Sequence, residues 1–194
     1  MTYDLTTLFN LALWQLGARR VTAYDEDTKE AQTLNALYPA WRDDCLSRND
    51  WTFAVRRASL ALLVEAPAFG ASYQFRVPPD CLRVIETSDG MDCGYLIEAD
   101  ANGKVLLTDS ATISIRYISR VENPAFWSPS FYNALATGLA SAACIPLTAG
   151  GEKRQQVLYA AYRAIFQDAM GLDTIETGTP RKSTPTSTLV ALRR

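Results

Sequence analysis

The sequence predicts an α+β fold: a bundle of about four helices, an inserted small antiparallel β-sheet and an extended C-terminal arm. Two observations lead to this prediction. Apolar residues recur at helical spacing in the first fifty residues and again after residue 124, but they alternate with polar residues in between. The final segment follows neither pattern. We therefore expect 1–50 and 124–178 to form the helical bundle, 51–123 the β-rich insertion and 179–194 the arm.

Two amphipathic helices are predicted in the N-terminal part. The first covers about residues 4–17 and ends at Gly17, with a single apolar face formed by Leu5, Leu8, Phe9, Ala12, Leu13 and Leu16. The second begins at Asp27, which can cap it together with Glu30 three residues later. Pro39 lies inside this helix and has no amide proton for the carbonyl of Asn35, so we expect a kink or two shorter helices.

The period changes to two from Trp51 onward, which predicts strands. Trp51, Phe53 and Val55 alternate with polar or small residues, and further alternating runs lie at 73–77 and 113–118. The turn sequence of residues 100–103, Asp-Ala-Asn-Gly, separates two short apolar runs and predicts a hairpin. These elements should form one small antiparallel sheet.

Helices return near the C-terminus. Ser128 is suited to cap a helix that starts at Pro129 and should end at Pro146. Its many Ala and Gly residues allow close approach of other helices, so we expect it to be the most buried helix. A last helix should cover about 152–171 and end at Gly171, with an inner face formed by Leu158, Ala161, Tyr162, Ile165 and Ala169.

The segment from Thr179 to Arg194 is rich in Thr, Ser and Pro, and it contains four basic residues and no acid. The net charge of the whole chain is −2, so the rest of the chain carries −6. Such a segment cannot bury enough apolar surface to fold alone. We expect an arm that becomes ordered on a partner through Arg181, Lys182, Leu189, Val190, Leu192, Arg193 and Arg194.

The composition excludes several classes of function. The 194 residues include no histidine, which excludes Ser-His-Asp and Cys-His nucleophiles and His-ligated metal sites. The four cysteines form no Cys-x-x-Cys pair, so we expect them to be reduced and mostly buried, with no metal and no cofactor. The N-terminus has no basic region of a signal peptide, and no apolar run is long enough to span a bilayer.

Three groups of carboxylates could form sites, but each has a simpler structural interpretation. Glu98, Asp100 and Asp109 lie around one hairpin and could form a glycosidase pair, but acids near a turn are usually solvated. The acidic run 25–27 has no glycine or distal glutamate of a calcium loop, which favours helix capping. Residues 43, 44 and 50, with Arg48, lie on a polar helix face that suits solvent or intersubunit contacts better than nuclease chemistry.

Two features predict contacts with neighbouring protein chains. Trp14 lies off the main apolar face of its helix, so it either packs on the sheet or marks a protein interface. Arg42, Asp43, Asp44 and Arg48 alternate in charge along one helix and could pair with complementary charges on a neighbour.

The order of the motifs resembles a known family. The runs, in chain order, are EAQTLNALYPAWRD (30–43), WTFA (51–54), YQFRVPPDCLRV (73–84), YLIE (95–98), LLT (106–108), IRYI (115–118) and FYNALA (131–136). This set resembles the head-to-tail adaptors of short-tailed bacteriophages, the tail tubular protein A family, up to about Asp173. Each motif alone is weak, and the ordered set carries the resemblance.

The resemblance implies a structural virion protein that is made in the host cytoplasm and has no catalytic residues. Such adaptors form a dodecameric ring beneath the portal protein. The ring extends the DNA channel and carries the tail nozzle and the fibre or spike proteins, while the C-terminal arm reaches toward the portal. DNA would pass without sequence-specific binding, which suits an acidic body, and no membrane is involved.

Three alternatives remain. One is a head-completion or stopper connector of long-tailed phages, and another is a virion-associated cell-wall hydrolase that uses Glu98. A DNA-binding regulator is the weakest, because only the arm is basic.

Overall fold

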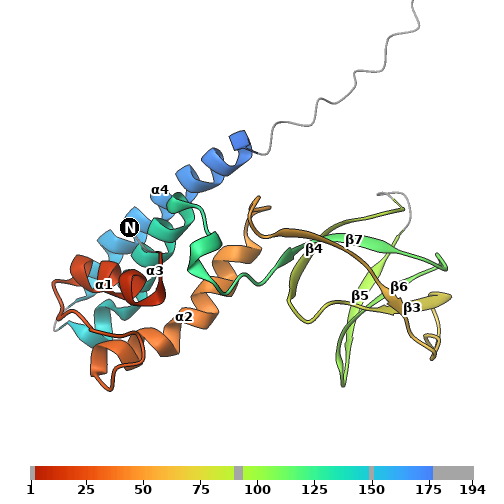
Figure 1. The fold of residues 1–194 in the computed structure, drawn as a ribbon, viewed down its shortest axis with the longest axis horizontal. Coiled ribbons are helices and arrows are strands. Elements are labelled where there is room, and N and C mark those ends of the chain that lie inside the picture. Colours follow the sequence, from red (N-terminus) through yellow and green to blue (C-terminus); the bar gives the residue numbers. More distant parts are fainter. Residues whose placement is uncertain (1–2, 90–93, 149–150, 177–194) are drawn as a thin grey trace, which may run out of the picture.

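The computed structural model describes residues 3–89, 94–148 and 151–176. Its helices gather on one side and its strands on the other (Figure 1), so the predicted α+β class is confirmed. The helices are α1 (Leu5–Leu16), α2 (Lys29–Ser47), α3 (Pro129–Leu147) and α4 (Glu152–Glu176), with a short 3-10 helix η1 (Pro124–Phe126) before α3. The strands all lie between α2 and η1 in the sequence. The arm, 179–194, falls outside the described residues.

Helix α3 forms the centre of the bundle, and α1, α2 and α4 pack around it. Most of its side chains are buried, as its small residues predicted. Gly138 shows why they must be small: a Cβ atom there would lie 2.9 Å from a ring carbon of Trp41 and 3.2 Å from the ring of Tyr162. The helix begins as predicted, because the Ser128 hydroxyl accepts a hydrogen bond from the amide of Phe131.

The strands form two antiparallel sheets instead of one. Strands β1 (Val55–Ser59), β7 (Ser114–Ser119) and β4 (Cys81–Thr87) pair in that order. The second sheet has the order β2 (Ala61–Leu62), β3 (Tyr73–Arg76), β6 (Gly103–Thr108) and β5 (Leu96–Asp100). The β5–β6 hairpin is present as predicted, and Gly103 adopts a φ of 125° at its turn. The two sheets enclose a small second core that contains Phe75, Leu106, Ile115 and Tyr117.

The first two helices differ little from their predictions. α1 buries its predicted apolar face and ends at Gly17, whose φ is 62°. α2 begins one residue later than expected, because the Thr28 hydroxyl caps it while Asp27 accepts a hydrogen bond from Gln32. It remains one helix through Pro39, which lies on the exposed side of the helix.

Three other boundaries were predicted wrongly. α3 runs one residue past Pro146, where the helix is already ending. α4 continues past Gly171 to Glu176, because Asp173 anchors its last turn to the segment before β1. Trp51 and Phe53 lie in a turn that precedes β1, since the Trp51 ring belongs to the bundle core, where its indole NH donates to the carbonyl of Cys45.

Hydrogen bonds and shared apolar contacts fix the β part to the bundle. Arg83 of β4 donates to the carbonyl of Ser47 at the end of α2, and Arg120 pairs with Asp43 at 2.8 Å. Ile118 of β7 is fully buried in the helical core. The two parts therefore meet in a single packed junction.

Candidate functional site

The outward side of α4 carries a stripe of apolar side chains. The inner side buries Tyr162, Phe166 and Ala169. On the other side, residues 157, 161, 164, 168, 172 and 175 follow one another at steps of three or four, which places them along one line of the helix. Apart from Asp168, this stripe is apolar, and Ile165 flanks it. Exposure reaches 68% at Val157, 55% at Leu172 and 77% at Ile175, so the stripe faces water in the single chain.

The sequence prediction misses this stripe, because it places both Ala161, which is a half-buried member of the stripe, and Ile165 on the inner face of the helix. Its place inside is taken by Phe166, and Ile165 is 36% exposed at the edge of the stripe. The spacing itself carried a usable signal, because apolar residues on α4 span more of the helix circumference than one buried face requires. A second apolar face on a long helix indicates contact with another chain.

Trp14 is the most exposed tryptophan of the described chain, at 74%, so it does not pack on the sheet. Its neighbour Gln15 uses its carbonyl to accept a 2.7 Å hydrogen bond from Arg154, in the first turn of α4. Trp14 and the start of the α4 stripe therefore belong to the same end of the bundle. Large exposed aromatics are enriched at protein interfaces, which keeps Trp14 an interface candidate.

The four charged residues predicted for intersubunit contacts divide into two pairs. Arg42 is only 7% exposed; its guanidinium lies over the ring of Tyr38 and pairs with Asp43 at 2.9 Å. Asp43 also pairs with Arg120, so both residues hold the junction within the chain. Asp44 and Arg48 form an exposed pair one helical turn apart, 2.8 Å between charged atoms, and remain accessible to a neighbour.

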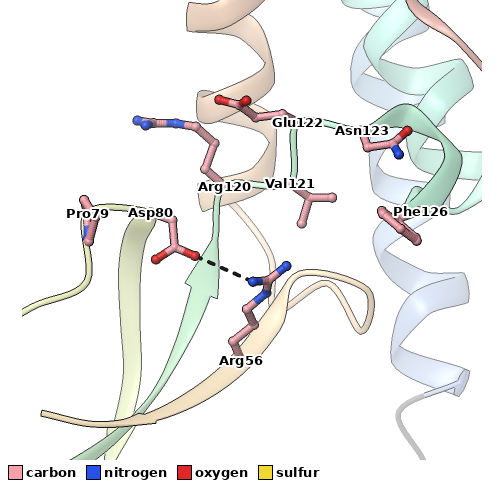
Figure 2. Close-up of a pocket in the computed structure, with 8 residues that line it drawn as sticks. All are labelled: Arg56, Pro79, Asp80, Arg120, Val121, Glu122, Asn123 and Phe126. Carbon is pink, nitrogen blue, oxygen red and sulfur yellow. Dashed lines mark ion pairs between the residues drawn. The ribbon is translucent and has the colours of Figure 1, made fainter.

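A hollow of about 420 Å³ opens at the junction between the bundle and the β part (Figure 2). Figure 2 shows the side chains of Arg56, Val121 and Phe126 facing this space, while that of Arg120 points away. Phe126 is 67% exposed, and Arg56 forms only a 4.0 Å ion pair with Asp80. The lining residues are Arg56, Pro79, Asp80, Arg120, Val121, Glu122, Asn123 and Phe126. The hollow offers the cation of Arg56 beside the acids Asp80 and Glu122 and apolar surface, which suits binding of a side chain from another molecule.

Two of the three carboxylates around the β5–β6 hairpin are engaged in hydrogen bonds with other residues. Asp100 accepts two hydrogen bonds from the guanidinium of Arg76, which lower its pKa to about 2. Asp109 accepts from the backbone and hydroxyl of Ser72. Glu98 is exposed and contacts no charged or polar partner among the described residues. The general acid of a glycosidase needs a raised pKa, whereas the contact with Arg76 lowers the pKa of Asp100.

The other two acidic groups also serve the fold. Glu26 accepts a hydrogen bond from the Thr22 amide, which lowers its pKa, and Asp27 accepts from Gln32. Asp50 pairs with Arg83 at the junction. Across residues 3–89, 94–148 and 151–176, no three Cys, Asp or Glu side chains gather in a way that could hold a metal ion. No helix in those ranges is long and apolar enough to cross a membrane.

The predicted docking residues of the arm, Arg181 to Arg194, lie outside the described residues, so their contacts stay a prediction. Comparisons with known proteins add no assignment. No protein-family model matches the chain, and no curated protein matches it.

Proposed function

We propose that this chain is the head-to-tail adaptor of a short-tailed bacteriophage. The structural observation that carries the proposal is the apolar stripe on α4, which would be exposed to water unless a neighbouring copy covers it. The stripe indicates that the chain assembles with other copies. The ordered sequence motifs favour the adaptor family as the kind of assembly. The helical bundles would tile a dodecameric ring through one interface repeated around an axis.

In this role the ring docks under the portal protein, continues the DNA channel and holds the tail nozzle and the fibre or spike proteins. The arm, 179–194, would contribute its apolar and basic residues to the portal contact. The rest of the chain carries an excess of acids, which favours sliding of DNA over binding to its phosphates. The protein would be made in the host cytoplasm and act as a structural part of the virion.

The decisive experiment mixes the purified chain with the portal ring encoded beside it and images the product by electron microscopy. The proposal predicts a second ring on one face of the portal, whose symmetry gives the number of copies. Failure of a folded chain to bind the portal would overturn it. Peptidoglycan hydrolysis that is lost in Glu98→Gln would instead establish the hydrolase alternative, and binding to a long-tailed phage portal would establish the stopper.

Paired variants test the stripe itself. Leu172→Ser should weaken ring formation on the portal about tenfold, which corresponds to ~1.4 kcal/mol, because it removes one exposed apolar contact of the stripe. Gln167→Ser, an exposed change on the same helix away from the stripe, is the matched control and should assemble normally.

Trp14→Ala should likewise weaken assembly and leave the melting temperature of the monomer nearly unchanged. A large fall in that temperature would show that Trp14 stabilises the single chain.

A further inference from the structure

The connection between β2 and β3 presents two bare apolar side chains. Val64 is fully exposed and Phe69 is 87% exposed, in the run Val-Glu-Ala-Pro-Ala-Phe. Single exposed apolar residues are ordinary, but two of them on one short loop indicate a contact surface. The acid between them, Glu65, is exposed and forms no ion pair with any residue that the structure describes.

Both stems of this loop are held in place. Gln74 of β3 accepts from the amide of Leu63 at 2.9 Å and donates to the carbonyl of Glu65 at 2.6 Å. On the other side, Asp109 accepts from the backbone and the hydroxyl of Ser72, at 2.9 and 2.8 Å. A loop whose stems are fixed loses less conformational entropy when it binds. The fixed stems therefore restrict the geometry of the loop that carries Glu65 and Phe69.

The junction hollow has the complementary chemistry. A guanidinium has five N–H donors, and that of Arg56 donates no hydrogen bond to any residue in the described ranges. Its ion-pair partner Asp80 already accepts from the hydroxyl of Tyr117. Beside Arg56 lie Val121 and the exposed ring of Phe126. Asp80 and Glu122 also line the hollow, but the donors of Arg56 still lack a hydrogen-bond acceptor among the described residues, and the ring of Phe126 is uncovered.

We infer that the loop 64–69 of one copy docks into the junction hollow of a second copy. Glu65 then meets Arg56, and Phe69 packs on Phe126 and Val121. This inference rests on the proposed ring and names a contact within it. A volume of about 420 Å³ is at the small end of ligand pockets, which suits one aromatic side chain and one carboxylate. The opposite charges also fix the direction of the contact.

The position of the two features requires that they come from different copies. The hollow lies where the β part joins the helices, whereas the β2–β3 connection lies at the end of the β part farthest from the helices (Figure 1). One chain cannot bring them together without unfolding its β part. A contact between two different surfaces of the same protein is heterologous, and its repetition closes a ring when the rotation permits.

Disulfide cross-linking between two copies tests this contact directly. In a background with Cys93→Ser, Phe69→Cys and Phe126→Cys are made as separate variants and mixed under oxidising conditions, with and without the portal ring. The inference predicts a cross-linked pair from the mixture and little from either variant alone. Lack of the cross-link in both conditions would overturn it. If the chain still forms a ring on the portal without the cross-link, the adaptor proposal stands and only this contact is wrong.

Charge reversal supplies a second readout on portal-bound rings. Glu65→Arg should weaken assembly about tenfold by opposing Arg56, and adding Arg56→Glu should restore it. Glu98→Arg makes the same charge change at another exposed acid of the β part and should assemble like the unmodified chain. Circular dichroism of each variant shows whether it folds. Equal assembly by Glu65→Arg and Glu98→Arg would contradict the inference.

Discussion

Asp173, near the end of α4, accepts hydrogen bonds from both the amide and the hydroxyl of Thr52, at 3.0 and 2.8 Å. Asn49 donates to the same carboxylate. Thr52 lies where the chain leaves the bundle for the β part, so this buried acid joins the last helix to the start of the insertion. A short polar contact therefore ties together segments 121 residues apart in the sequence.

Replacing Asp173 by Ala should destabilise the chain by about 1–3 kcal/mol, because it removes the shared acceptor of the partly buried hydrogen bonds from Thr52 and Asn49. Urea unfolding of the chain measures the change. Thr52→Ala removes only the hydroxyl and should cost less, about 1 kcal/mol. An unchanged unfolding midpoint for Asp173→Ala would show that these bonds contribute little.

Two glycines that both lie within helices should respond oppositely to alanine. At Gly138 the new methyl group would collide with Trp41 and Tyr162, so Gly138→Ala should destabilise by about 1–3 kcal/mol. At Gly171 a Cβ atom meets nothing within 4 Å, so Gly171→Ala should stabilise α4 by up to ~1 kcal/mol through helix propensity. Thermal unfolding of the monomers compares them, and the same sign for both would refute the packing argument.

The Arg76–Asp100 contact should be sensitive to acid. The guanidinium lowers the pKa of Asp100 from 3.8 to about 2. A lowered pKa means that the contact stabilises the hairpin above pH 4 and is lost as the pH falls toward 2. Carbon-detected NMR titration should show the pKa of Asp100 rising in Arg76→Gln and staying low in Arg57→Gln. A low pKa in both variants would assign the shift to another group.

Cys45 should resist alkylation in the folded chain. Burial raises the pKa of its thiol to about 12, and its sulfur lies 3.4 Å from the hydroxyl of Tyr162. Iodoacetamide reacts with thiolates, so at pH 8 the folded chain should leave Cys45 unmodified while chain unfolded in guanidinium is labelled. Mass spectrometry of the tryptic peptides measures both. Equal labelling rates would show that the bundle opens around α2.

Local sequence signals predicted the helices and most strands well. Capping by Ser128, the stop at Gly17 and the hairpin turn at Gly103 depend on neighbouring residues alone, so they could be read directly. Cys45, Cys81 and Cys144 are free and buried as expected, and Cys93 lies outside the described residues.

The errors came from contacts between residues distant in sequence. Nothing near Gly171 indicates that Asp173 holds the next turn in place through Thr52. The period-two pattern of Trp51 and Phe53 is the same in a strand and in an extended turn, and only packing against the bundle decides between them. The candidate surfaces show the same limit: Arg42 is polar in sequence, yet the fold buries it, and its ion-pair partner distant in sequence is Glu122, 3.9 Å away.

The central place of α3 also sets the order in which a newly made chain can fold. α1 packs mainly on α3, and α3 packs most extensively on α4, yet the whole β part is synthesised between α2 and α3. No helix interrupts the strands in the sequence, so the strands can pair while this segment is still near the ribosome. Until the last two helices are synthesised, the apolar faces of α1 and α2 remain exposed to water. Chaperones that shield apolar helices should therefore be needed most during the second half of translation.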